Sequence, residues 1–154
     1  MGVGLRLRCK SVFVLFYLVL AAVVSAEELT SGVATTSPYV AKIEAHTTME
    51  LDSILRRVDR ILKDDQDYSA ENPIALVLHG VEIQAFLKNN YQQNQDLVDV
   101  AARLDAYNAV DIQVCETWMR LNDVDHSQLP PFISTVPYGP AAEAALIDQG
   151  YDYF

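Results

Sequence analysis

Residues 74–80 have the sequence IALVLHG, and this stretch decides the class of fold. Its first five residues are apolar, Pro73 precedes them, and Gly80 closes the stretch. A continuous apolar run of this length is typical of a strand covered on both faces, as in a parallel sheet between layers of helices. Residues 110–114, with the sequence VDIQV, form a second segment of strand type. We therefore predict that both segments are strands of one mostly parallel sheet.

Helical segments separate the expected strands. Thr47 and Glu50 have the spacing of a capping box, and apolar residues recur at helical spacing after them. The next helical segments are expected at residues 81–89 and at about 95–107, where Asn108 suits a left-handed turn at the end. Each helix would carry the chain from one parallel strand to the next.

Strand and helix signals continue to alternate in the rest of the chain. Further strands are expected at residues 39–45, 132–136 and 151–154, and a further helix begins near Pro140 and ends at Gly150. Alternation of this kind predicts an α/β fold, in the form of a three-layer α/β/α sandwich with a mostly parallel five-stranded sheet.

The first 26 residues have the features of a secretory signal peptide. Basic residues precede an apolar stretch at residues 11–24, and small residues then form a cleavage site after Ala26. The apolar stretch is shorter than the roughly 20 residues of a membrane-spanning helix. We therefore expect cleavage, no stable membrane insertion afterwards, and a periplasmic or secreted protein. An uncleaved membrane anchor is the alternative.

Composition limits the partners of the remaining chain. Residues 27–37 are small and polar, so we expect a disordered spacer there and one domain at residues 38–154. The chain has a formal net charge of −10, and loss of the basic leader makes it more acidic. Negative charge repels phosphate backbones, so we predict no nucleic acid partner. Two interpretations of the negative charge stay open. It serves only to keep the protein soluble, or it also favours binding of a basic protein partner.

The expected sheet brings reactive side chains together. Ligands of parallel sheets bind beyond the carboxyl ends of the strands. His46, His79 and Cys115 follow or end the first three expected strands, so we expect them at one edge of the sheet as candidate catalytic residues. Candidate ligand-pocket residues at the same edge are Gly80, Glu82, Glu116, Trp118 and Tyr138.

Cys115 is the one cysteine that remains once the leader, with Cys9, is removed. A thiol without an internal disulfide partner serves for reaction, for metal binding or as a buried residue. The strand turns into a helix at Glu116, and the positive end of a helix dipole stabilises a thiolate or a persulfide anion. The carboxylate of Glu116 works against this effect. A reactive thiol and a structural cysteine therefore both stay open.

The histidines have a similar choice of roles. His79 or His46 would act as a base or thiolate partner for Cys115, or each would only bond to backbone groups at a strand end. His46, His79, Cys115 and Glu82 have the chemistry of zinc or iron ligands but no tight sequence spacing, so we predict neither a metal nor a cofactor. His126 lies in a polar stretch and is expected to be solvated.

Ordered segments also give the chain a family resemblance. They are IALVLHG at 74–80, VCETWMR at 114–120 and VPYG at 136–139, followed by Gly150-Tyr151. Over residues 39–154 the chain resembles the DsrE/DsrF-like (DsrEFH-like, sulfur-relay) proteins, as an exported branch with a signal peptide. The resemblance implies a flavodoxin-like sandwich, homo-oligomers that are trimers or hexamers, and a persulfide carried at the position of Cys115.

These observations lead to a hypothesis of sulfur handling outside the cytoplasm. Cys115 would carry sulfane sulfur as a persulfide, in a sulfur carrier or a sulfurtransferase, with a sulfur donor or acceptor protein as partner. The alternative is a non-catalytic oligomeric module that binds a small ligand or a metal at the same edge and uses Cys115 structurally. A third possibility is an assembly subunit in which Trp118 contacts another chain.

Overall fold

The computed structural model describes Met1, residues 37–64 and residues 72–154. Residues 2–36 and 65–71 lie outside the described residues, and with them nearly all of the predicted signal peptide and of the predicted spacer. Every described helix and strand belongs to the compact unit Thr35–Phe154. Within the described ranges, no helix is long and apolar enough to cross a membrane.

Among the described residues, five strands form one sheet in the order β4-β3-β2-β1-β5, and every pair of neighbours is parallel. The mostly parallel sheet that the sequence predicts is thus confirmed. All side chains of the central strand β2 are buried, as its unbroken apolar run indicates. The strands are β1 (Tyr39–Val40), β2 (Ile74–Leu78), β3 (Val110–Cys115), β4 (Ser134–Val136) and β5 (Asp152–Tyr153).

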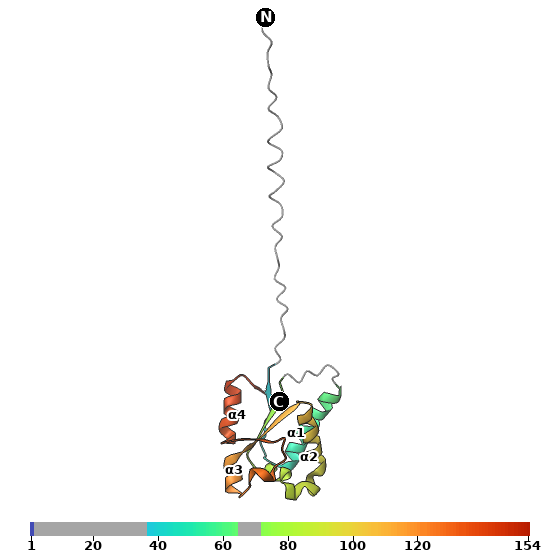
Figure 1. The fold of residues 1–154 in the computed structure, drawn as a ribbon, viewed down its shortest axis with the longest axis vertical. Coiled ribbons are helices and arrows are strands. Elements are labelled where there is room, and N and C mark those ends of the chain that lie inside the picture. The colour runs from blue at the N-terminus through green and yellow to red at the C-terminus, as the bar shows by residue number, and fades with distance from the viewer. Residues whose placement is uncertain (2–36, 65–71) are drawn as a thin grey trace. The chain divides into compact units, whose positions relative to one another are not determined.

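In the part of the chain that the structure describes, four α-helices flank this sheet. Figure 1 shows α1 and α2 to one side of the sheet and α3 and α4 to the other, which confirms the predicted three-layer α/β/α sandwich. Parallel strands require such crossover connections, because the end of one strand lies far from the start of the next. The helices are α1 (Thr48–Asp64), α2 (Tyr91–Ala106), α3 (Glu116–Leu121) and α4 (Gly139–Asp148).

A single hydrophobic cluster joins the sheet to α1 and α2. Leu76 and Leu78 of β2 and Ile112 of β3 are fully buried, and the helices contribute side chains such as Leu55 and Leu104 to the same cluster. Burying apolar side chains of this size contributes roughly 1.5–3 kcal/mol each. The strand ends that carry the candidate site therefore rest on a well-packed core.

Three segments differ from the expected elements. Residues 81–89 form two 3₁₀ helices, η1 (Val81–Phe86) and η2 (Lys88–Asn90), because Leu87 between them is extended. Helix α2 starts at Tyr91, earlier than expected, and non-helical angles at Asn94 kink its first turns. Strand β1 ends at Val40, so a loop separates it from His46, which is left-handed with φ of 52°.

Candidate functional site

The two candidate histidines meet beyond the carboxyl end of β2. His79 follows the last residue of that strand, and His46 lies in the loop that precedes α1. Their imidazole rings have centroids 4.2 Å apart and are tilted by 52°. Both side chains are partly exposed, 27% for His46 and 22% for His79. The two residues lie 33 positions apart in the sequence. The structure brings their titratable rings together at one edge of the parallel sheet.

Glu82 is the fully buried member of this group. Its Oε1 atom accepts hydrogen bonds from the backbone nitrogens of His79 at 3.0 Å and Gly80 at 2.9 Å. The same oxygen lies 3.2 Å from Nδ1 of His46. A buried carboxyl group is costly unless it is hydrogen-bonded, so these contacts stabilise the turn after β2. We call His46, His79, Gly80 and Glu82 the edge cluster.

The other oxygen of Glu82 has a different environment. Oε2 is buried and has no hydrogen-bonding partner among the described residues. An unpartnered buried oxygen costs free energy, and in native proteins it is usually satisfied by a proton, a water or a ligand. Glu82 therefore gives the edge cluster one unused polar atom.

Gly80 is required by the packing of the edge cluster. A Cβ atom at this position would lie 2.5 Å from Cβ of His46 and 2.6 Å from Oε2 of Glu82. Both distances are well below van der Waals contact, so any larger residue would push one of these side chains away. The His79-Gly80 pair at the end of β2 is thus explained by close approach to His46 and Glu82.

Cys115 ends β3 and is buried, with 2% of its surface exposed. Its Sγ atom accepts a hydrogen bond of 3.2 Å from the backbone nitrogen of Gly139, the first residue of α4. Cys115 is the N-cap residue of α3, as the sequence predicts, but its side chain makes no capping bond there. The thiol also lies at the N-terminus of the longer helix α4, whose dipole favours negative charge on sulfur.

Gly139 also connects the thiol to the edge cluster. A Cβ atom on Gly139 would lie 2.7 Å from Cβ and 3.1 Å from Cδ2 of His79, so the backbone here passes directly against that side chain. The hydrogen bond of Sγ goes to Gly139, and within residues 37–64 and 72–154 no hydrogen bond joins Sγ to either imidazole. The contacts thus run from Cys115 through Gly139 to His79 and on to His46.

The electrostatics of His79 favour its neutral form. Burial lowers the pKa of His79, and the neighbouring imidazole of His46 lowers this pKa further. The carboxylates of Glu82 and Glu143 act in the opposite direction with smaller effect. Nε2 of His79 lies 4.0 Å from Oε2 of Glu143 on α4, at the limit of an ion pair. A neutral imidazole is able to accept a proton near neutral pH.

The remaining predicted pocket residues do not join the edge cluster. Glu116 is exposed, and its carboxylate accepts a hydrogen bond of 2.8 Å from the hydroxyl of Thr135. Trp118 is partly buried and packs against the hydrophobic core, and Tyr138 is 54% exposed in the turn before α4. His126 is exposed in a turn that Asp125 caps, as expected for a solvated residue.

No group of three or more His, Cys, Asp or Glu side chains is arranged for metal binding in the part of the chain that the structure describes. The zinc or iron site considered for His46, His79, Cys115 and Glu82 therefore has no geometric support. The contacts that the structure shows between His46, His79, Gly80 and Glu82 are hydrogen bonds and close packing.

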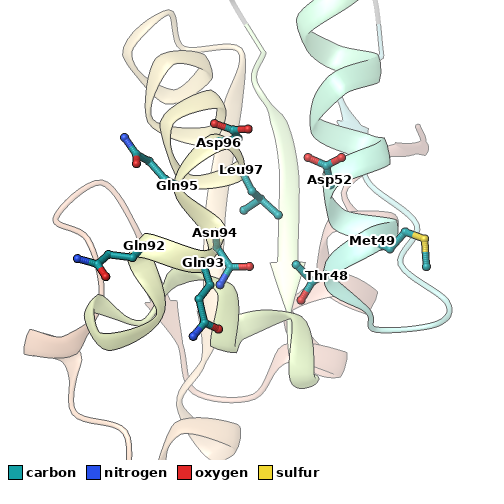
Figure 2. A pocket seen from close by; sticks show the side chains of 9 residues that line it. All are labelled: Thr48, Met49, Asp52, Gln92, Gln93, Asn94, Gln95, Asp96 and Leu97. Carbon is teal, nitrogen blue, oxygen red and sulfur yellow. The ribbon is translucent and has the colours of Figure 1, made fainter.

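A surface hollow of about 540 Å³ lies between the first turns of α1 and α2 (Figure 2). Asp52 and Asp96 approach it from the two helices, and the kinked segment around Asn94 lies beside them. Asp52 is already bonded to Arg56 at 2.8 Å. No member of the edge cluster lines this hollow, so it is separate from the chemistry at Cys115. The lining residues are Thr48, Met49, Asp52, Gln92, Gln93, Asn94, Gln95, Asp96 and Leu97.

The sequence predicted the histidines, Gly80, Glu82 and Cys115 as neighbours at this edge. It also placed the turn with Tyr138 and Gly139 there, but it did not predict the contacts of Gly139 and it missed Glu143. The turn Pro137-Tyr138-Gly139-Pro140 was the available signal, because its glycine precedes a helix-starting proline at the end of β4. No local pattern shows that this glycine lies against a thiol from another strand.

Comparison with known proteins supports the fold alone. No family model and no curated protein matches this sequence. Among solved structures, the chain is similar to the structure of a protein of unknown function, MTH1491 from Methanobacterium thermoautotrophicum. The TM-score is 0.53 at 13% sequence identity, and the match covers 75% of this chain and 93% of the other. At this identity the similarity supports the α/β architecture and carries no function.

Proposed function

We propose that the protein handles sulfur outside the cytoplasm and carries sulfane sulfur as a persulfide on Cys115. The observation that carries this proposal is the hydrogen bond from Gly139 to Sγ at the first residue of α4. A backbone N–H at a helix N-terminus stabilises an anionic sulfur without supplying a competing charge. The export signal in the sequence and the resemblance to DsrE/DsrF-like proteins support the location and the type of chemistry.

The proposed transfer needs no oxidant. The thiolate of Cys115 attacks the outer sulfur of a donor persulfide or polysulfide, a new S–S bond forms at Sγ, and the S–S bond of the donor breaks. The donor leaves as a thiolate that has lost one sulfur atom. The proton released by the Cys115 thiol is taken up by a base and returned to the leaving thiolate. Sulfur is exchanged between two chains or molecules, and the electrons balance.

Burial of Cys115 sets a condition on this function. Since only 2% of the residue is exposed, a persulfide would be protected from solvent reductants between transfers. Loading then requires a small inorganic donor or a movement of the turn at residues 137–140, which includes the exposed Tyr138. A donor or acceptor protein and a trimeric or hexameric assembly belong to the same proposal, and native mass of the purified protein would test the assembly.

The test is sulfur loading of wild type and Cys115→Ser. Each protein is exposed to polysulfide, its intact mass is measured before and after reduction, and peptide mapping separates Cys9 from Cys115. We expect a reducible gain of one or more sulfur atoms on Cys115. Equal labile sulfur in Cys115→Ser and wild type would contradict the proposal.

A second candidate function is binding of a small ligand at the edge cluster, with Cys115 as a packed structural residue. The buried and unpartnered Oε2 atom of Glu82 favours it, because a ligand with a hydrogen-bond donor would satisfy this oxygen. Native mass spectrometry of protein purified without added ligand tests this candidate. A retained small molecule that is lost in Glu82→Gln would favour binding over sulfur carriage.

A further inference from the structure

Two backbone amides define the role of one Glu82 oxygen. The nitrogens of His79 and Gly80 both point hydrogen-bond donors at Oε1, over 3.0 and 2.9 Å. A backbone N–H only donates, so Oε1 acts as an acceptor in both bonds. An oxygen that accepts two such bonds is not the protonated oxygen of a carboxyl group. Any proton on Glu82 would therefore be on Oε2.

This assignment also settles the hydrogen on His46. Nδ1 of His46 lies 3.2 Å from the same Oε1 atom, and a bond between them needs a donor on the imidazole side. Nδ1 must then carry a hydrogen, whether or not His46 is charged. In neutral His46 the lone pair is left on Nε2, because each neutral imidazole has one donor nitrogen and one acceptor nitrogen.

Packing around His46 holds this arrangement in place. Cβ and Cγ of His46 would lie 2.5 and 2.8 Å from a Cβ on Gly80, so the backbone of Gly80 presses directly on the base of the ring. The ring of His79 lies on another side, with its centroid 4.2 Å from that of His46. These contacts oppose a flip of the ring that would exchange Nδ1 and Nε2.

We propose that Glu82 is a positioning residue that holds His46 in its Nδ1–H form, which makes Nε2 of His46 the proton acceptor of this edge. Glu82 is completely buried, whereas 27% of the His46 side chain is exposed. The carboxyl group thus acts from inside the protein on a ring that solvent reaches. In proton-transfer sites a buried carboxyl group commonly orients an imidazole, and the imidazole acts as the base.

The use of this acceptor rests on the proposed sulfur carriage. Transfer to Cys115 releases a thiol proton and later returns it to the leaving thiolate, so a base is needed close to the thiol. The contact path from Sγ through Gly139 and the His79 ring ends at His46. Both histidines of this path are partly exposed, and His46 is the one whose tautomer the contact with Glu82 defines.

Nuclear magnetic resonance tests the orientation without any sulfur chemistry. Long-range ¹H–¹⁵N spectra of the full chain with labelled histidine show which nitrogen of each neutral ring carries hydrogen, and His46→Asn identifies the signals of His46. We expect the Nδ1–H form in wild type and in Glu82→Gln, whose amide oxygen still accepts. Glu82→Met lacks an acceptor and should shift His46 toward the Nε2–H form. An Nε2–H form in wild type, or no change in a folded Glu82→Met, would overturn the positioning role.

Sulfur loading tests the base. His46→Asn is the informative variant, since its amide N–H is able to keep the contact with Glu82 while the Nε2 acceptor is lost. We expect loading of Cys115 to slow about tenfold or more in His46→Asn, as general bases contribute at least this much. Loading should stay within about threefold of wild type in the control His126→Asn, because His126 is exposed in a surface turn outside the edge cluster. Unchanged loading in His46→Asn would overturn the base role even if Cys115→Ser fails to load. Equal loading of Cys115→Ser and wild type would instead defeat the proposed function, while the tautomer spectra would still decide the role of Glu82.

Discussion

The backbone nitrogen of Gly139 donates a hydrogen bond to Sγ of Cys115 over 3.2 Å. The two residues belong to different elements, since Cys115 ends β3 and Gly139 begins α4. The hydrogen bond to the thiol therefore comes from the backbone of a helix that begins 24 residues further along the chain. The same glycine touches His79, so one position controls both the sulfur atom and the edge cluster.

Replacement of Gly139 should disturb both neighbours at once. In Gly139→Ala, the new Cβ would meet Cβ of His79 at 2.7 Å, and the start of α4 would have to shift. We expect a loss of about 1–3 kcal/mol in the free energy of unfolding, as in other overpacked sites. Displacement of the N–H from Sγ should also change the rate at which Cys115 is alkylated in the native state. Urea unfolding and timed alkylation with mass detection measure the two effects.

Gly150→Ala is the matched control for this variant. Gly150 has φ of +92°, so alanine is strained there, but a Cβ would meet nothing within 4 Å. The control should lose stability without altering the alkylation of Cys115. If Gly139→Ala and Gly150→Ala alkylate at the same rate, Gly139 has no specific effect on the thiol.

Gly80→Ala should damage the edge cluster and leave the thiol bond intact. Its Cβ would lie 2.5 Å from Cβ of His46 and 2.6 Å from Oε2 of Glu82, so His46 must move. We expect destabilisation of about 1–3 kcal/mol and shifted imidazole signals of His46. Urea unfolding and histidine ¹H–¹⁵N spectra check these outcomes. Wild-type His46 signals in this variant would show that the close approach of Gly80 has no effect on the ring.

The stability of the fold should decrease below about pH 6.5 because of His79. Burial and then the charge of His46 lower the pKa of His79 in the folded chain relative to its ordinary value of 6.5. The folded state therefore binds fewer protons than the unfolded state in this range. The contribution of His79 is fully present above the unfolded pKa and is lost as pH falls through the folded pKa.

Urea unfolding between about pH 8 and pH 5.5 measures this decrease in the free energy of unfolding. The decrease should begin near the ordinary pKa of histidine, at about 6.5. His79→Gln should remove part of the decrease, because glutamine does not titrate. His126→Gln should retain it, since His126 is exposed in a surface turn. Identical pH dependence in wild type and His79→Gln would contradict the assignment of this effect to His79.

The central strand should dominate the stability of the domain. Leu76 of β2 is fully buried between layers of the sandwich. Leu76→Ala should cost about 2–5 kcal/mol, because truncation loses buried apolar surface and leaves a cavity. Leu121, which is 77% exposed, provides the matched substitution, and Leu121→Ala should change stability by no more than about 0.5 kcal/mol. Similar urea midpoints for the two variants would be inconsistent with this core.

Helices and strands were predictable where the sequence has a clear hydrophobic pattern or a clear capping signal. The apolar run at Ile74–Leu78 corresponds to β2. At the start of α1 one bond of the predicted capping box is formed, in which Oγ1 of Thr47 accepts from the nitrogen of Glu50 at 3.2 Å. The carboxylate of Glu50 accepts instead from the backbone nitrogens of Glu44 and Ala45, both at 2.9 Å. Asn108 adopts the expected left-handed conformation with φ of 54°. Local propensity and burial agree in these segments, so the sequence signal is clear.

The site was only partly predictable because its contacts are not local. The sheet topology explains why His46, His79 and Cys115 approach one edge. Complete burial of Glu82 and the bond from Gly139 to Sγ depend on packing between separate elements. The 3₁₀ form of Val81–Phe86 was likewise hidden, since its apolar spacing resembles that of an α-helix.

The pairing of β1 with β5 has a consequence for the order of events during biosynthesis. Tyr39 lies opposite Asp152 and Val40 opposite Tyr153. The first strand pairs with β2 on one side, but its partner on the other side is formed by residues 152–153. A chain that emerges from its N-terminal side, from a ribosome or a translocation channel, therefore cannot complete this sheet before Tyr153 is free. Contacts of such long sequence separation are costly to close early. Late closure would keep the polypeptide open while it is threaded through a channel, which is compatible with the export that we propose.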